Sequence, residues 1–340
     1  MYNPSAVGKI GSLFGLPYSQ EESDLIIIPV ELDVTTSYVA GTSFAPNLIL
    51  QESAQLDLSL LAIEKPWELK MALGDSLSKT KHNEKYRTIA EKIIARLENG
   101  DEAGEVSNQL HSVNHFCEEV QDELTDTSAE LIDKNKLVAV LGGDHSSPFG
   151  LIKALSRIHE FGILQIDAHM DLRNAYEGFH HSHASIMYNA LQLTNVKTLT
   201  QVGIRDYCEE EELYMENSAR SVHTFFDESL FKKRLRGKGW TVQTEEIIET
   251  LPQKVYISFD IDGLDPAHCP HTGTPVPGGL SFNEAVFLIE MVVRSGREII
   301  GFDLCEVGNS AWDANVGARV LYRLATAMGV SKKLLQFKKS

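Results

Sequence analysis

Seven short runs of apolar residues recur along the chain, and longer amphipathic stretches separate them. Each run is rich in Val, Ile, Leu and Phe. Near-continuous apolar runs of about four to eight residues are typical of parallel strands that are buried on both faces. We therefore predict strands at residues 24–31, 136–143, 162–169, 198–205, 222–227, 255–262 and 298–307.

The stretches between these strands contain helical patterns, at residues 85–100, 147–159 and 281–296. Ser281 and Glu284 form the S-x-x-E arrangement of a capping box at the start of the last one. The alternation of strand and helix predicts a three-layer α/β/α sandwich with a central, largely parallel sheet.

Two segments carry no clear pattern, and we expect residues 66–82 and the acidic residues 209–217 to be loops. No change in composition marks a second domain. Residues 1–340 are therefore expected to form a single domain.

Composition excludes several functions. The formal net charge is −17, from 31 Lys and Arg against 48 Asp and Glu, which disfavours nucleic-acid binding because Lys and Arg must neutralise phosphate. Only four cysteines are present and none form a C-x-x-C pair, which favours a reducing compartment over a disulfide framework. The N-terminus lacks a signal-peptide pattern, and the longest apolar stretch is far shorter than the roughly 20 residues of a membrane span. We expect a cytoplasmic protein that binds neither nucleic acid nor membrane.

Three of the predicted strands end in residues of metal-ligand types, at positions 144–145, 167–171 and 260–262. In an extended segment, residues two apart project from the same side, so each alternating set converges on one point. In open α/β sheets, ligands bind outside the carboxyl ends of the strands, which is where these clusters lie. The candidate metal ligands are His145, Asp167, His169, Asp171, Asp260 and Asp262.

Four aspartates gathered at one point require cations. Charged groups are rarely buried unless they are paired or bind a metal, and unneutralised carboxylates perturb one another's pKa values strongly. Two divalent ions would cancel the charge of four carboxylates. Carboxylates combined with neutral imidazoles suit an ion such as Mn²⁺. Because a metal pair ~3.5–4 Å apart lowers the pKa of a bridging water, the sequence predicts metal-assisted hydrolysis.

Six short motifs follow one another through most of the chain. They are VAGTSFAP (39–46), GGDHS (142–146), DAHMD (167–171), SFDIDGLDP (258–266), HTGTPVPGG (271–279) and DLCEVG (303–308). In this order they resemble the ureohydrolase family, which comprises arginases, agmatinases and related amidinohydrolases. The resemblance implies an arginase-like fold, assembly into a trimer or hexamer, and hydrolysis of a guanidino compound to urea and an amine.

The resemblance also implies how the ligands are divided between two ions. One ion would be held by His145, Asp167, Asp171 and Asp260. The other would be held by Asp167, His169, Asp260 and Asp262, so that Asp167 and Asp260 bridge. Asp262 would also accept the proton of the attacking hydroxide and pass it to the departing amine.

The segment 176–190 contains S-H-A-S and resembles the agmatinase-type stretch that carries the catalytic histidine. His183 would be this proton shuttle, with His180 and His181 as neighbouring rivals. Glu306 matches the family carboxylate that grips the guanidinium, since paired charge-assisted hydrogen bonds orient a planar cation well.

The substrate is less well specified. Arginases hold the amino-acid end of their substrate with a polar stretch after the second metal motif, whereas residues 172–183 here read LRNAYEGFHHSH. The resemblance therefore favours agmatine or another small cationic guanidino compound without an α-carboxylate. Arg173 and Tyr176 are expected to lie at the substrate pocket. The Arg173 side chain would there either bind a carboxylate of the substrate or make the pocket smaller. The alternatives are an arginase, a formiminoglutamase, and a guanidine hydrolase that uses Ni²⁺ in place of Mn²⁺.

A catalytically inactive metal-binding regulator is the alternative from a different class, because fold alone does not give function. The presence of all the ligand positions together with His183 and Glu306 weighs against it. Near the third metal motif, Cys269 and His271 are expected to be loop residues, and Cys305 is expected to be a small core residue.

Overall fold

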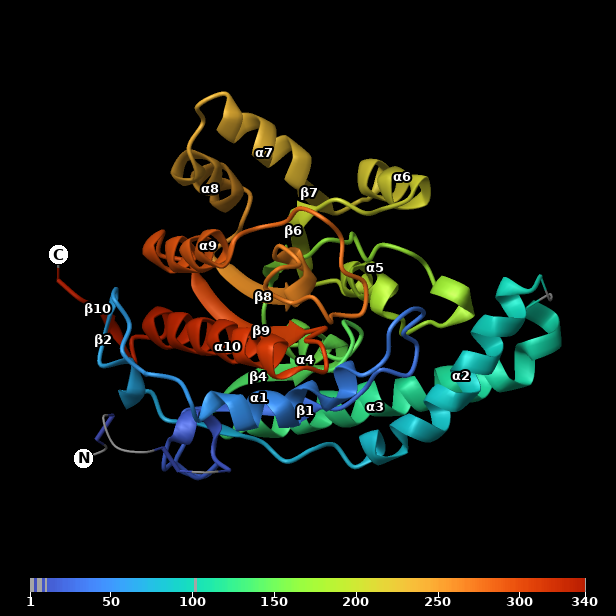
Figure 1. The fold of residues 1–340 in the computed structure, drawn as a ribbon, viewed down its shortest axis with the longest axis horizontal. Helices are drawn as coiled ribbons and strands as arrows, with labels where there is room; N and C mark the ends of the chain where they lie inside the picture. Colours follow the sequence, from blue (N-terminus) through green and yellow to red (C-terminus); the bar gives the residue numbers. More distant parts are fainter. Residues whose placement is uncertain (1–2, 5–7, 10, 101–102, 340) are drawn as a thin grey trace.

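The computed structural model describes residues 3–4, 8–9, 11–100 and 103–339. Its centre is an eight-stranded sheet with the order β3-β1-β4-β9-β8-β5-β6-β7, in which every neighbouring pair is parallel (Figure 1). The strands are β1 (Leu25–Val30), β3 (Met71–Leu73), β4 (Leu137–Gly142), β5 (Phe161–Ile166), β6 (Val196–Ile204), β7 (Ser221–Phe226), β8 (Lys254–Asp260) and β9 (Glu298–Cys305). A separate antiparallel pair joins β2 (Ile63–Glu64) to β10 (Gln336–Phe337).

Both faces of the sheet are covered, as the apolar runs predict. Every residue of β1 is buried, and its side chains alternate between two hydrophobic cores, with Leu25 and Ile27 in one and Ile26 and Ile28 in the other. A strand can bury side chains on both sides only if a helical layer covers each face. The predicted three-layer α/β/α sandwich is confirmed.

Helices form the two outer layers. One layer contains α1 (Ala45–Ser53), α8 (Trp240–Glu249), α9 (Phe282–Arg294) and α10 (Ala311–Ser331). The opposite layer contains α2 (Asn83–Glu98), α3 (Ser107–Asp133), α4 (Phe149–Ser156) and α5 (Ile186–Gln192). Near the edge strand β7 lie α6 (Glu209–Asn217) and α7 (Asp227–Leu235), and Figure 1 shows α2 and α3 extending together beyond the sheet. None of the helices in the described ranges combines the length and apolar composition that a membrane span needs.

The three predicted helices correspond to α2, α4 and α9. The capping box of α9 is present, because Ser281 Oγ accepts the N–H of Glu284 at 3.3 Å and Glu284 Oε2 accepts the N–H of Ser281 at 2.9 Å. The prediction that residues 66–82 form a loop holds only in part, because they contain the short edge strand β3 and two 3₁₀ helices, Pro66–Glu68 and Lys79–His82.

The prediction that residues 209–217 form a loop is wrong, because they form α6. The Glu211 carboxylate accepts the N–H of Cys208 at 3.0 Å and so satisfies a backbone donor at the start of the helix. The consecutive glutamates lie in the first turn, where negative charge is favourable. Glu211 is the buried residue of α6, so the helix has no apolar stripe from which it could be recognised.

Four neighbouring strands in the middle of the sheet, β4, β9, β8 and β5, position the site. Because these strands are parallel, their carboxyl ends meet at one edge. Strands β5 and β8 end at Ile166 and Asp260, a few residues earlier than predicted. Several site residues therefore lie in the loop after β5 and in the 3₁₀ turn Ile261–Gly263 after β8.

Candidate metal centre and substrate cavity

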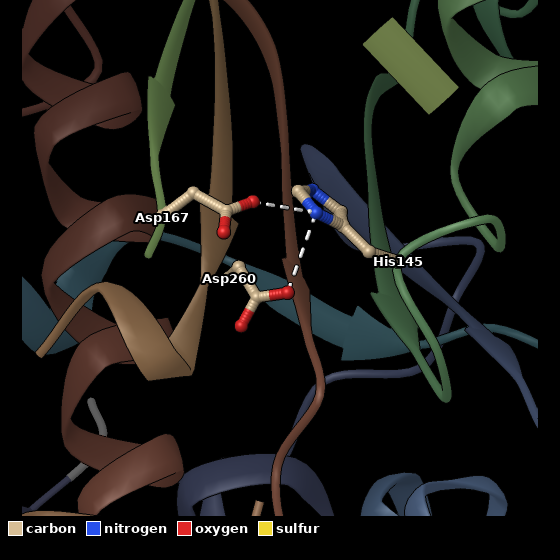
Figure 2. A group of neighbouring side chains, drawn as sticks. All are labelled: His145, Asp167 and Asp260. Carbon is tan, nitrogen blue, oxygen red and sulfur yellow. Dashed lines mark ion pairs between the residues drawn. The ribbon is translucent and has the colours of Figure 1, made fainter. Parts of the chain in front are cut away.

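The six predicted ligands lie together at this edge of the sheet. Figure 2 shows Asp167 and Asp260 facing the imidazole of His145. The possible ligand atoms form two groups whose members all lie within 4.8 Å of one another; they are His145, Asp167 and Asp260 in the first, and Asp167, His169 and Asp262 in the second. Asp167 belongs to both groups.

Three carboxylates converge on one nitrogen of His145. Its Nδ1 lies 2.9 Å from Asp167 Oδ2, 2.8 Å from Asp171 Oδ2 and 3.3 Å from Asp260 Oδ2. A ring nitrogen carries at most one hydrogen, which cannot serve three oxygens, and this atom makes no well-oriented hydrogen bond within the described chain. The arrangement fits a cation held between the nitrogen and the oxygens.

The other ring nitrogen of His145 contacts Ser258. Nε2 lies 2.9 Å from Ser258 Oγ, and Ser258 donates its hydroxyl hydrogen to Asp303 Oδ2 at 2.9 Å. Because Ser258 has a single hydrogen and an ionised Asp303 can only accept, Ser258 accepts from the Nε2–H of His145. A neutral His145 then presents an unprotonated Nδ1, which is the form that binds a metal ion.

Asp262 and His169 complete the second group. His169 Nδ1 lies 3.1 Å from Asp262 Oδ2 and 3.6 Å from Asp167 Oδ1. The other oxygen of Asp262, Oδ1, accepts the N–H of Ala168 at 3.0 Å. This hydrogen bond ties the turn after β8 to the loop after β5 and leaves Oδ2 facing His169.

Asp171 and Glu306 have a left-handed backbone that residues with side chains rarely adopt, with φ angles of 56° and 61°. Such a conformation costs on the order of 1–3 kcal/mol and persists only where the surroundings fix it. The carbonyl of Asp171 accepts two N–H groups of α5 at 3.1 Å, and the carbonyl of Glu306 accepts the hydroxyl of Thr272 at 2.7 Å. These bonds hold both residues in place.

The clustered charges shift the pKa values of the site. Burial, followed by the charge of Asp167, raises the pKa of Asp171 to about 7. Burial and the nearby carboxylates of Asp262 and Asp167 raise the pKa of Asp260 well above its usual value. Burial lowers the pKa of His145, but Asp167 and Asp171 outweigh it and hold this pKa well above its usual value. These shifts show excess negative charge, which divalent cations would neutralise.

A cavity of about 160 Å³ opens beside these residues, and His169, Asp171 and His183 line it. The Nδ1 of His183 is buried and has no hydrogen-bond partner among the described residues. Burial, followed by the charges of His169 and His145, lowers the pKa of His183 to about 3, so its imidazole is neutral at physiological pH. Of its two rivals, His181 packs against the ring of Phe149 with 5.3 Å between centroids, and His180 is exposed.

Arg173 and Tyr176 line the same cavity. The Arg173 guanidinium lies 4.6 Å from the centre of the Tyr176 ring, within cation–π range. Its Nε lies 3.7 Å from Glu211 Oε2, which is an ion pair too long for a hydrogen bond, and the guanidinium donates no hydrogen bond to the described residues. Arg173 therefore retains donors for a ligand in the cavity.

Glu306 does not line the described cavity but lies beside His145, whose N–H it accepts at 2.9 Å through Oε1. Its Oε2 is buried without a hydrogen-bond partner in the described part of the chain. A Cβ atom at Gly273 would lie 3.1 Å from Oε2, so the glycine keeps space in front of this oxygen. Burial, followed by the charge of Asp144, raises the pKa of Glu306 well above its usual value.

The residues near the third metal motif hold the loop to α10. Asp313, in the first turn of α10, accepts the N–H of His271 at 2.9 Å and the thiol of Cys269 at 3.0 Å. Both residues are thus loop residues, as expected. Cys305 is fully buried in β9, which agrees with its predicted place in the core.

Ser258 and Asp303 are parts of the site that were not predicted from the sequence. Asp303 gave a signal that could have been used, because a charged residue within an otherwise apolar strand is rarely buried unless it is paired. Ser258 gave none, since its role depends on a histidine that follows a different strand.

The fold and the site together define a class of metal-dependent enzymes, and comparisons with known proteins agree. The sequence model of the Arginase family matches residues 23–328. N(1)-aminopropylagmatine ureohydrolase of Thermus thermophilus is 30% identical over 320 residues, covering 90% of this chain and 89% of that protein. Agmatinase of Bacillus subtilis is 27% identical over 310 residues, covering 88% and 90%.

Solved structures show the same fold. Proclavaminate amidino hydrolase from Streptomyces clavuligerus superposes with a TM-score of 0.74 at 21% identity, covering 96% of this chain and 99% of that one. The chain belongs to the arginase family. The predicted resemblance to ureohydrolases, the arginase-like fold and the assignment as a hydrolase of this family are confirmed.

Proposed function

We propose that the chain uses two divalent ions to hydrolyse a small cationic guanidino compound to urea and an amine. The observation that carries this proposal is the pair of ligand groups that share Asp167, next to a cavity lined by His169, Asp171 and His183. Buried ligand atoms without hydrogen-bond partners, among them His145 Nδ1 in the described structure, support the presence of cations.

The ions would be held by His145, Asp167, His169, Asp171, Asp260 and Asp262. We propose Mn²⁺, because carboxylate oxygens and neutral imidazoles suit it, with Ni²⁺ as the alternative. Asp167 would bridge the ions, since it belongs to both groups, and Asp260 is the second proposed bridge. When bound, such a pair lowers the pKa of a water molecule and supplies hydroxide near neutral pH.

The side chains of the site would position the substrate and move protons. Glu306 would hold the guanidinium with its free oxygen Oε2. Asp262 would accept a proton from the attacking water and pass it to the departing amine. His183 would carry protons between solvent and that amine, because its neutral imidazole lies at the cavity.

Agmatine, or a similar guanidino amine, is the substrate that we propose first. The names of the relatives with 27–30% identity specify agmatine or aminopropylagmatine. The carboxylates of Asp206 and Glu211 also line the cavity, and negative charge there would favour a cationic tail.

A guanidino acid such as 4-guanidinobutyrate is a second candidate, favoured by the free donors of Arg173. Arg173→Met separates the two, because it removes a charge-assisted bond to a carboxylate tail. For an acid substrate, kcat/KM should fall about 10- to 100-fold, whereas for an amine it should not fall. Arg319→Met, at an exposed position on α10, is the control.

The decisive experiment is a panel of substrates tested with Mn²⁺ and with Ni²⁺. The panel contains agmatine, arginine, 4-guanidinobutyrate and guanidine, assayed by urea release, and formiminoglutamate, assayed by glutamate release. Urea from agmatine or a related amine is the expected result. Turnover of arginine would instead indicate an arginase, turnover of guanidine a guanidine hydrolase, and turnover of formiminoglutamate a formiminoglutamase. A chain that binds the metal but releases no product from any compound would be a metal-binding regulator.

We also propose a cytoplasmic protein, from its cysteine content, that does not bind nucleic acid, from its negative charge. The uniform composition and the short apolar stretches further support one domain and no membrane binding. The four cysteines are free thiols in the structure. From the family relationship we propose a homo-oligomer, a trimer or hexamer, which light scattering coupled to gel filtration would test.

A further inference from the structure

Two buried glutamines connect the edge strand β7 to Asp167. The Nε2 of Gln201, in β6, donates to Gln165 Oε1 at 2.7 Å, and the Nε2 of Gln165, in β5, donates to Asp167 Oδ2 at 2.8 Å. At the outer end, the hydroxyl of Thr224 in β7 donates to Gln201 Oε1 at 2.8 Å. Thr224, Gln201 and Gln165, here called the glutamine relay, thus form one chain of donors that ends on the carboxylate shared by both ligand groups.

The direction of the relay is fixed by its acceptors. The same NH₂ group of Gln201 also donates to the carbonyl of Met170 at 2.8 Å, and that of Gln165 also donates to the carbonyl of His169 at 3.2 Å. Turning either amide around would place its oxygen against oxygen atoms that can only accept. The N–H groups of Gln201 therefore point to Gln165 and the carbonyl of Met170, and those of Gln165 point to Asp167 and the carbonyl of His169.

The relay acts on both the carboxylate and the loop of Asp167. Asp167 Oδ1 accepts the N–H of His169 at 2.6 Å and Oδ2 accepts from Gln165, so each oxygen retains lone-pair capacity for a cation. The bonds to the carbonyls of His169 and Met170 also fix the segment just before Asp171, whose left-handed backbone needs such support. Both glutamines are completely buried, and a fully satisfied buried network of this kind rigidifies its surroundings.

We propose that Gln165 and Gln201 are positioning residues of the metal centre, which orient Asp167 and the loop 167–171 so that this segment can hold both ions. They would contact neither substrate nor metal and would act through Asp167 and through the carbonyls of His169 and Met170. The inference rests on the proposed metal centre and extends it by two strands, to β6 and β7. Outer partners of metal ligands typically contribute about 10- to 100-fold in metal affinity.

Gln165→Met and Gln201→Met remove the amide groups with little change in volume. Mn²⁺ is titrated into the metal-free full chain, and free Mn²⁺ is followed by its electron paramagnetic resonance signal. Gln165→Met should weaken Mn²⁺ binding about 10- to 100-fold, and Gln201→Met should weaken it less. Gln243→Met is the matched control, because Gln243 is equally buried but lies in α8, where it donates to the carbonyl of Lys238. This control should lower the melting temperature without changing the affinity.

Two further measurements separate positioning from loss of packing. The visible spectrum of the Co²⁺-loaded chain should change in Gln165→Met and stay unchanged in Gln243→Met. In the double variant Gln165→Met/Gln201→Met, the part of the Gln201 effect that passes through Gln165 should vanish, while the part that passes through the carbonyl of Met170 should remain, so the combined loss should be smaller than the sum of the two single losses. Losses of affinity that simply add would overturn the relay, and so would wild-type affinity in both single variants.

If Gln165→Met does not fold, Thr224→Val tests the outer end of the relay with a smaller change. It should weaken Mn²⁺ binding a few-fold relative to Gln243→Met, and equal affinities would overturn the inference. A wild-type chain that binds no Mn²⁺ is a different outcome, since it would overturn the proposed function itself.

Discussion

The Nε2 atom of His145 lies 2.9 Å from the hydroxyl oxygen of Ser258, although His145 follows β4, Ser258 lies in β8, and β9 separates these two strands. Asp303, on that intervening strand, receives the hydroxyl hydrogen of Ser258. Contacts from β8 and β9 thus determine that Nδ1 of His145, which follows β4, remains free to bind a cation.

Ser258→Ala should therefore weaken metal binding. Without the hydroxyl, Nε2 loses its acceptor and the tautomer with a free Nδ1 is no longer favoured. We expect Mn²⁺ affinity to fall about 10- to 100-fold. Ser128→Ala is a matched control, because Ser128 is equally buried in α3 and its hydroxyl has no hydrogen-bond partner in the described ranges. Wild-type affinity in Ser258→Ala would contradict the tautomer assignment.

Asp167→Ala should abolish turnover and remove most of the bound metal, because it deletes the ligand shared by the two groups. Asp260→Ala, at the second proposed bridge, should do the same. Metal content is measured by mass spectrometry after gel filtration. Asp265→Ala is the control, since the carboxylate of Asp265 accepts the N–H of Ala267 and belongs to neither ligand group. Full activity with full metal content in Asp167→Ala would exclude the shared-ligand assignment.

His183→Ala should retain the metal but lower kcat about 10²- to 10⁴-fold, the usual contribution of a positioned proton-transfer group. The control is His181→Ala, because the ring of His181 packs against Phe149 and His181 does not line the cavity. If His181→Ala lost turnover while His183→Ala kept it, the two histidines would exchange roles.

Glu306→Gln should weaken the binding and orientation of the guanidinium. The amide oxygen still accepts the N–H of His145, so the local structure is retained while the charge is lost. We expect kcat/KM to fall about 10- to 100-fold, with a rise in KM and unchanged metal content. Unchanged steady-state kinetics would remove Glu306 from the substrate site.

The metal-free protein should lose stability as the pH rises from 6.5 to 8.5. Burial raises the pKa of Asp171 to about 7 and holds those of Asp260 and Glu306 well above their usual values. Although burial opposes it, neighbouring carboxylates also raise the pKa of His145. Over this range the folded chain therefore binds protons that the unfolded chain has released, so its stability falls. Burial lowers the pKa of His183 to about 3, so this residue opposes the trend only near pH 6.5, where a histidine in the unfolded chain is still partly protonated.

Thermal melts at pH 6.5, 7.5 and 8.5, with and without Mn²⁺, would measure this effect. The melting temperature of the metal-free chain should fall with rising pH. The increase caused by Mn²⁺ should be larger at pH 8.5 than at pH 6.5, because the ions replace the missing protons. A metal-free melting temperature that rises over this range would contradict the assigned pKa shifts.

The sheet could be predicted from the sequence because buried parallel strands appear as short apolar runs. The ligands could be predicted because they are polar residues at the ends of those runs. Helix α6 could not be predicted, because its first turn consists of glutamates and its buried residue is Glu211, so the helix lacks an apolar face. The contacts of Ser258 and Gln201 could not be predicted either. Each depends on which strands become neighbours, and the order β4-β9-β8-β5-β6 is a property of the whole chain.

The parallel order of the strands also has a kinetic consequence. The ligands lie at or just after the ends of β4, β5 and β8, and these ends meet only when β9 and β8 have taken their places between β4 and β5. Closing such long loops is slow, because the chain loses conformational entropy before the stabilising contacts between the strands can form. A refolding chain should therefore acquire metal affinity late, and uptake of Mn²⁺ would mark the moment at which the sheet is complete.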